Sequence, residues 1–237
     1  MRTILTYFPK ITGPLRSYFN YFFGEKEIKY FFNYLQKYKN KYVFLDIGAN
    51  YGIYTFLFGK HASYVHAIEP IKECIDYIKK GYRYQNIRYF NKVLSNDNNV
   101  KSLNIPLVNN KLIFGQSSIN KTFKLSKEIK INSFTLDYFE NDRNIIKSDL
   151  LFIKVDVEGH ENSIFETTGK LLKHPKTIMM VEIEPRHNQN YKSLFKNLFF
   201  LGFDSYYLMN NKLVKIIEIN DLSKIMQKNI NFIFKNY

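Results

Sequence analysis

Several residue types are scarce in this chain, and each scarcity excludes a class of site. Tryptophan is absent, and cysteine occurs once, as Cys74. A single cysteine forms no intramolecular disulfide and no cysteine-based zinc site, so the composition is typical of a protein in a reducing, cytoplasmic compartment. No run of about 18 apolar residues is present, which predicts that no helix spans a membrane. Residues 1–10 lack the apolar segment and the small-residue cleavage site of a signal peptide.

Arginine is also scarce, although the chain is strongly basic. The net charge is +14, but only six of the 35 Lys and Arg residues are Arg. Specific recognition of phosphates and bases favours the planar guanidinium of Arg. The lysines are scattered, so we interpret the charge mainly as a solvated surface and disfavour a nucleic-acid partner. An anionic membrane, a polyanionic glycan or RNA is the alternative.

The prediction of function depends on the stretch from Val43 to Gly52, V-F-L-D-I-G-A-N-Y-G. An apolar, strand-like run ends in Asp46. Gly48, Asn50 and Gly52 then favour a sharp turn in which the backbone comes close to a ligand. Helix-compatible residues follow, so the pattern predicts a strand, a Gly-rich turn and a helix.

A second predicted strand, residues 64–68, ends in Glu69 about 20 residues past the turn. Strand, Gly-rich turn, helix, strand and acid is the plan of a nucleotide-binding βαβ unit, in which the acid binds ribose hydroxyls. The turn is G-x-N-x-G and not the dinucleotide pattern G-x-G-x-x-G, which disfavours a nicotinamide oxidoreductase. No P-loop lysine is present, which disfavours a polyphosphate ligand.

The rest of the chain predicts how the sheet closes. Buried strands are expected at 150–155 and 177–183, and a β-hairpin insertion at 100–125. Strands 203–208 and 212–217 flank an Asn-Asn turn and are therefore antiparallel. This layout predicts an α/β, Rossmann-like class I methyltransferase fold. Its sheet would be mostly parallel and seven-stranded, with an antiparallel last strand, helices on both faces and the β-hairpin insertion.

Three segments are expected along the chain: a helical, aromatic-rich N-terminal extension at 1–40, a methyltransferase domain at 41–220 and a C-terminal helical tail at 221–237. In the extension, Ile28, Phe31, Phe32 and Leu35 have helical spacing. We expect this segment to pack on the sheet domain or to cover the acceptor pocket. The alternative is a basic, aromatic surface that contacts a bilayer and makes the protein membrane-peripheral.

Five motifs together resemble the FkbM-type methyltransferases, over about Val43 to Glu184. They are F-L-D-I-G-A-N-Y-G-I-Y-T at 44–55, A-I-E-P at 67–70, S-S at 117–118, T-L-D at 135–137 and F-I-K-V-D-V-E-G-H-E at 152–161. The resemblance implies S-adenosylmethionine as the cofactor. It also implies O-methylation of a hydroxyl on a sugar or a polyketide-like molecule.

The resemblance further implies which residues bind the cofactor. The turn would line its methionine part, Glu69 would bind the ribose, the segment around Ser95 would flank the adenine, and Asp156 would lie near the amino group or the methyl. The complete predicted set is Asp46, Gly48, Ala49, Asn50, Gly52, Thr55, Glu69, Pro70, Leu94, Ser95 and Asp156.

Catalytic candidates cluster where two buried strands end. A sugar hydroxyl is a poor nucleophile until a base removes its proton, so a carboxylate or a histidine is needed there. We favour Asp156 and Glu158, because they head the strand nearest the cofactor methyl in this layout. Capping of the following helix is the alternative role for such acids. No spacing is diagnostic of a metal site. The candidates are Asp156, Glu158, His160, Glu184 and His187.

These observations predict a methyltransferase that acts on a hydroxyl of a glycan or a small metabolite. An RNA-directed methyltransferase, or a nucleic-acid-binding protein that uses the basic surface, is the alternative. Only the net charge of +14 favours that alternative.

Overall fold

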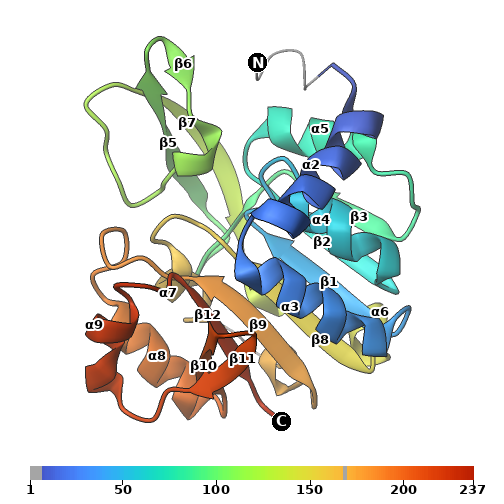
Figure 1. The fold of residues 1–237 in the computed structure, drawn as a ribbon. Coiled ribbons are helices and arrows are strands. Elements are labelled where there is room, and N and C mark those ends of the chain that lie inside the picture. Colours follow the sequence, from blue (N-terminus) through green and yellow to red (C-terminus); the bar gives the residue numbers. More distant parts are fainter. Residues whose placement is uncertain (1–6, 168–169) are drawn as a thin grey trace. The chain divides into compact units, whose positions relative to one another are not determined.

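The computed structural model describes residues 7–167 and 170–237. The chain divides into two compact units, the first comprising Met1–Asn91 and Arg143–Lys154, the second Lys92–Asp142 and Val155–Tyr237. Figure 1 colours the elements of both units along the sequence. Among the described residues, none of the helices combines the length and the apolar content needed to cross a bilayer.

The first unit contains a sheet with the strand order β8-β1-β2-β3. β1 pairs in parallel with β2, and β2 with β3, as predicted for a βαβ unit. All residues of β1 and β8 are buried, as is typical of central parallel strands. The strands are β1 (Tyr42–Ile47), β2 (Tyr64–Ile68), β3 (Ile87–Phe90) and β8 (Leu150–Val155), whose last residue belongs to the second unit.

The predicted N-terminal extension is helical at residues 9–23 and 26–35, and its first six residues lie outside the described part of the chain. Phe31 stacks on Phe152 of β8 with ring centroids 4.7 Å apart, and Ile28 and Leu35 are buried. The segment therefore packs on the first unit (blue in Figure 1). The helices of this unit are α2 (Pro9–Phe23), α3 (Lys26–Leu35), α4 (Ile53–Phe58), α5 (Lys72–Gly81) and α6 (Arg143–Ile146), with 3₁₀ turns η1 (Gln36–Tyr38) and η2 (Gly59–His61).

The second unit contains a sheet with the order β11-β10-β12-β9, in which β12 is antiparallel to β9 and β10, and β10 is antiparallel to β11. The strands are β9 (Thr177–Glu182), β10 (Asp204–Met209), β11 (Lys212–Lys215) and β12 (Asn231–Lys235). The helical elements are α7 (Glu161–Ile164), α8 (Tyr191–Phe200), α9 (Leu222–Ile225), η3 (Phe114–Gln116), η4 (Leu136–Phe139), η5 (Leu171–Lys173) and η6 (Ile219–Asp221).

The expected hairpin insertion belongs to a separate sheet of the second unit, with the order β4-β7-β5-β6. β5 and β6 form the hairpin across Asn109 and Asn110, whose positive φ values of 49° and 56° suit this tight turn. β7 pairs with β5 through residues 126–132, and its last two residues pair with β4. The strands are β4 (Val93–Leu94), β5 (Val100–Val108), β6 (Lys111–Leu112) and β7 (Ser126–Phe134).

Two sequence-based predictions about the sheet need correction. In the described residues, the strand orders β8-β1-β2-β3 and β11-β10-β12-β9 contain eight strands in all, and not the predicted seven. The β10–β11 hairpin is confirmed, but β11 is an edge strand, and the antiparallel strand between β9 and β10 is β12. The predicted helical tail at 221–237 is therefore wrong beyond α9. β12 is a short apolar run, N-F-I-F-K, whose sequence fits either a helix or a strand. Pairing with β9 and β10 on its two sides makes it a strand.

Candidate active site

The turn after β1 adopts the conformation that its small residues predict. Gly48, Asn50 and Gly52 have positive φ values of 76°, 48° and 76°. A Cβ atom on Gly52 would lie only 2.8 Å from Cγ1 of Ile78, so glycine is required for both conformation and space. The backbone N–H groups of Gly48 and Ala49 each donate to the carbonyl oxygen of Ile68 at 3.0 Å. The turn is thereby fixed to the end of β2.

Glu69 links this turn to the helix that follows β2. Its side chain is buried, with Oε2 accepting the N–H of Asn50 at 2.7 Å and Oε1 accepting the N–H of Ile71 at 2.8 Å. An ionised carboxylate only accepts hydrogen bonds, which is the kind of partner that ribose hydroxyls require. The residues present therefore fit the ribose diol of a nucleoside-containing cofactor.

Asp46 and Thr55 meet inside the first unit. The Thr55 hydroxyl, from α4, donates to Oδ2 of Asp46 at 2.5 Å, and both residues are at most 1% exposed. Ala49 is buried and Pro70 is half-buried beside Glu69. The first unit thus brings eight of the predicted cofactor residues to the β1 turn and the end of β2. Leu94, Ser95 and Asp156 belong to the second unit.

Sequence reasoning missed two residues that support this site. The Nδ2 group of Asn91 donates to the carbonyl oxygens of Glu69 and Pro70, at 3.1 and 2.7 Å. Cys74 of α5 lies 3.6 Å from Oδ1 of Asn50 and is buried, and burial raises the pKa of its thiol. No sequence motif marks either residue, because their partners lie 21 to 24 residues away in the chain.

In the second unit, acidic side chains surround a small hollow of about 180 Å³. In the described residues, no group of three or more His, Cys, Asp or Glu side chains has the arrangement of a metal site. The lining residues are Asp156, Glu158, Gly159, Glu161, Glu182, Glu184 and His187.

Glu158 and His187 form a pair in this hollow. Oε2 of Glu158 is hydrogen-bonded to Nδ1 of His187, and both side chains are largely buried. Burial, and secondly the charge of Asp156, raises the pKa of Glu158 to about 7. Burial, and secondly the charge of Lys121, lowers the pKa of His187. Both shifts favour the neutral forms of the two side chains.

Glu161 holds the loop that carries Glu158. Its buried carboxylate accepts the N–H of Gly159 at 2.8 Å through Oε1 and the side-chain amide of Asn188 at 2.7 Å through Oε2. Burial raises the pKa of Glu161. Glu184 interacts with Arg186, whose Nη2 donates to Oε1 at 3.0 Å, so its charge is partly neutralised.

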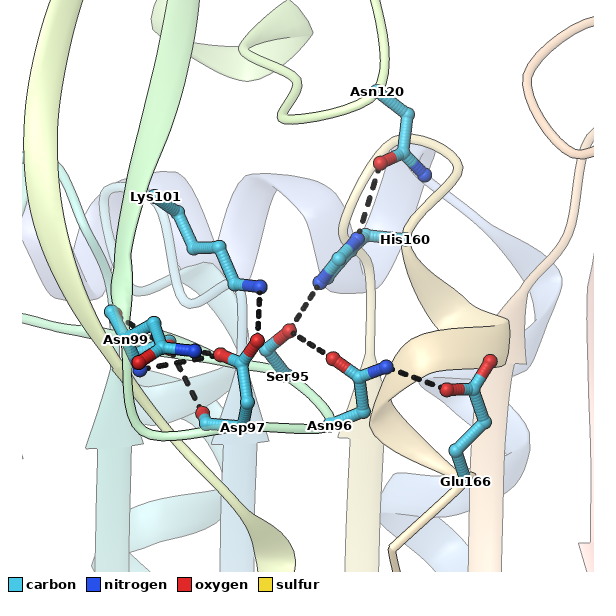
Figure 2. Close-up of polar contacts among 9 residues, drawn as sticks. Ser95, Asn96, Asp97, Asn99, Lys101, Asn120, His160 and Glu166 are labelled. Atoms are coloured by element: carbon cyan, nitrogen blue, oxygen red, sulfur yellow. Dashed lines mark hydrogen bonds and ion pairs between the residues drawn. The ribbon is translucent and has the colours of Figure 1, made fainter.

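His160 lies in a polar network apart from the lining of the hollow (Figure 2). Its Nε2 is 3.0 Å from Oγ of Ser95, and its Nδ1 is 3.3 Å from Oδ1 of Asn120. Burial, and secondly the charge of Lys101, lowers the pKa of His160 to about 4. The ring is therefore neutral at pH 7, and both of its nitrogens have partners.

Asn120 defines the tautomer of His160. Its Nδ2 donates to the carbonyl oxygen of Gly159 at 2.7 Å, so its Oδ1 faces the imidazole as an acceptor. Nδ1 of His160 then carries the proton, and Nε2 is an acceptor that shares the single hydroxyl proton of Ser95 with Oδ1 of Asn96, 3.2 Å from Oγ. The predicted adenine-flanking Ser95 and the predicted catalytic His160 thus contact each other, and Leu94 is buried beside them. Ser118 adds a hydrogen bond to the carbonyl oxygen of Glu158 at 2.9 Å.

Fold and site together define a class of enzyme. A Gly-rich turn after β1 and a buried acid after β2 accompany an antiparallel strand between β9 and β10. This combination defines a class I methyltransferase of Rossmann-like fold. The family model of the methyltransferase FkbM domain matches residues 46–207, more than half of the chain, and the protein belongs to this family. It is accordingly an S-adenosylmethionine-dependent methyltransferase. No protein of curated function matches the chain significantly.

Several solved structures are similar to this chain at low sequence identity. The methyltransferase FkbM of Methylobacillus flagellatus KT is 12% identical, with a TM-score of 0.45; the match covers 83% of this chain and 44% of that one. An rRNA methylase from Streptococcus thermophilus is 9% identical, with a TM-score of 0.46 and coverages of 89% and 95%. The tRNA (m1A58) methyltransferase TrmI of Aquifex aeolicus is 11% identical, with a TM-score of 0.42 and coverages of 87% and 67%. Similarity at this level does not identify a substrate.

Proposed function

We propose that this methyltransferase transfers a methyl group to a hydroxyl oxygen of a glycan or small metabolite, with Glu158 as the general base. The observation that carries the proposal is the Glu158–His187 pair in the acid-lined hollow, with the pKa of Glu158 raised to about 7. A general base is most effective when its pKa lies near the working pH.

The chemistry assigns a separate task to each side chain. S-adenosylmethionine supplies a methyl group on a positively charged sulfur, which is a reactive electrophile. Glu158 accepts the proton of the acceptor hydroxyl, and His187 receives that proton through Oε2 and releases it to solvent. Asp156 raises the pKa of Glu158 through its charge. Glu161 and Gly159 hold the loop in place.

Cofactor binding is assigned to the residues predicted from the sequence. Glu69 would accept hydrogen bonds from the ribose hydroxyls, and the turn from Gly48 to Gly52 would contact the methionine part. Asp46 and Thr55 support that turn through their mutual hydrogen bond. Ser95 would lie beside the adenine, with His160 as its positioning residue.

The acidic lining supports a neutral acceptor over RNA. Five carboxylates line the hollow, Asp156, Glu158, Glu161, Glu182 and Glu184. A polyanionic strand would be repelled by such a lining, whereas a sugar hydroxyl carries no charge. The lysines that give the net charge of +14 are scattered along the sequence.

The test compares the Glu158→Gln variant with the parent protein. Both are incubated with S-adenosylmethionine and, separately, with a panel of nucleotide sugars, oligosaccharides and total RNA, and S-adenosylhomocysteine release is measured. We expect release with a hydroxyl-bearing sugar, a methyl ether in the product by NMR, and a loss of about 10²–10⁴-fold in Glu158→Gln. The matched control is Glu128→Gln, an exposed acid on β7.

Calorimetry with S-adenosylhomocysteine checks that Glu158→Gln still binds the cofactor product. A rate within a few-fold of the parent would exclude Glu158 as the base. A methyl group on a nitrogen of RNA would overturn the acceptor assignment.

A further inference from the structure

Helix α2 buries small and polar side chains and exposes large apolar ones, the reverse of an ordinary surface helix. The residues that it buries are small or polar, namely Pro9, Thr12, Gly13 and Ser17. The Thr12 hydroxyl lies 2.7 Å from the Tyr77 hydroxyl. A surface helix of a globular protein normally buries its large apolar side chains and exposes its polar ones.

The close contact of α2 with the first unit requires these small residues. A Cβ atom on Gly13 would lie 2.4 Å from the ring of Phe56. The Ser17 hydroxyl donates to the carbonyl oxygen of Ile53 at 2.8 Å. The inward face of α2 is therefore fixed by specific contacts. The face with large side chains could not take its place against the first unit.

The opposite face of α2 carries large apolar side chains in solvent. They recur every three or four residues and are 44% to 77% exposed. A contiguous exposed apolar surface of this kind marks an interaction site in a soluble protein. We call it the outer face of α2, and it consists of Ile11, Leu15, Tyr18, Phe19, Phe22 and Phe23.

Basic groups flank the outer face. Lys60 donates to the Tyr18 hydroxyl at 2.6 Å and lies 4.9 Å from the centre of that ring. Near the start of the helix, Arg83 donates to the carbonyl oxygen of Lys10 at 3.1 Å, and both side chains are exposed. Helix α2 itself contains no acidic residue. The surface thus combines aromatic rings with positive charge.

We propose that the outer face of α2 lies on an anionic lipid bilayer, with the helix in the plane of the surface. Aromatic rings with flanking lysines suit the boundary between acyl chains and headgroups, where positive charge attracts anionic lipid. Fifteen residues of helix extend about 22 Å, which suits lying in the interface and not spanning it. The proposal is independent of the acceptor and of the role of Glu158.

Charge favours lipid over a second copy of the chain. A symmetric dimer would bring the outer face of α2 against itself and place the Lys60 and Lys10 groups of both copies in one interface. Like charges across an interface are costly, and α2 supplies no acid to compensate them. Anionic headgroups complement the same basic groups.

Flotation of the full chain with two kinds of vesicle tests the proposal. One kind contains phosphatidylcholine alone and the other also contains about one third phosphatidylglycerol. We expect binding to the anionic vesicles, weakening with added salt. The double substitution Phe19→Ser/Phe22→Ser should weaken that binding by about tenfold or more, because two exposed rings no longer enter the lipid. Lys60→Gln should weaken it several-fold.

A second exposed phenylalanine pair provides the matched control. Phe199 and Phe200 of α8 are 67% and 84% exposed, so Phe199→Ser/Phe200→Ser removes the same groups elsewhere. This variant should float like the parent. Absence of flotation with anionic vesicles, or equal losses in the two double variants, would overturn the proposal. So would unchanged binding in Phe19→Ser/Phe22→Ser, or lipid-free self-association that only this variant loses, since the outer face would then bind protein.

Discussion

A Cβ atom at Gly159 would lie 2.4 Å from the backbone oxygen of His187, so the loops after β8 and β9 touch at this glycine. Gly159 also has a φ value of +98°, which residues other than glycine rarely adopt. Its neighbour Glu158 has a φ value of +51° and is paired with the side chain of His187. The backbone contact and the side-chain pair are thus parts of one arrangement.

Gly159→Ala should destabilise the protein by about 2–4 kcal/mol, because it adds a steric clash to the backbone strain. Gly202→Ala is the matched control, since Gly202 has a φ value of +88° with nothing within 4 Å of a built Cβ. The control should lose only about 1–2 kcal/mol from the strain. Urea unfolding of both variants measures the difference. Equal losses would mean that the contact with His187 relaxes at no cost.

The rate of methyl transfer should depend on the ionisation of Glu158. Because the pKa of this carboxyl is raised to about 7, the base is progressively protonated below neutral pH. The single-turnover rate should therefore fall about tenfold per pH unit on the acid side and level off above pH 7. Glu158→Gln should remove this dependence, whereas Glu128→Gln should keep it. A rate independent of pH below neutrality in the parent protein would contradict the assignment.

His160 should make the protein less stable in acid. Its pKa is lowered from 6.5 to about 4 in the folded state, so the unfolded chain binds the extra proton between these values. The stability that the neutral ring provides is present above pH 6.5 and is lost as the pH falls toward 4, by on the order of 2–3 kcal/mol. Urea unfolding across this range should show a smaller loss in His160→Gln than in the parent. An identical loss in both proteins would show that other groups cause it.

Glu69→Ala should weaken binding of S-adenosylhomocysteine by on the order of 1–3 kcal/mol, because a charged acceptor of hydroxyls is removed. It should also destabilise the fold, since the N–H groups of Asn50 and Ile71 lose their acceptor. Calorimetry and unfolding separate the two effects. Glu73→Ala, at an exposed acid on α5, should change neither. Unchanged affinity in a folded Glu69→Ala protein would remove Glu69 from the cofactor site.

Local conformation was the part of the site that the sequence predicted well. Glycine and asparagine predict positive φ wherever they occur in short turns, and Gly48, Asn50 and Gly52 all have it. The β10–β11 hairpin follows from Asn210 and Asn211 for the same reason, with φ values of 49° and 59°. Such features depend on residues only a few positions apart.

Non-local pairings could not be predicted in this way. Ser95 and Asn120 contact His160 from 65 and 40 residues away in the chain. The periodicity of α2 shows that the helix has two different faces. It does not show that the small face is the inner one, which depends on the space beside Phe56.

The position of β12 determines the order in which the second unit is completed during synthesis. β12 is made after β10 and β11, yet it pairs with both β10 and β9. Until residues 231–235 have left the ribosome, one edge of β9 and one edge of β10 expose unpaired backbone groups. Exposed strand edges recruit other chains and chaperones. The nascent protein therefore exposes these edges until β12 emerges, and ribosome stalling in that interval should trap it with chaperones.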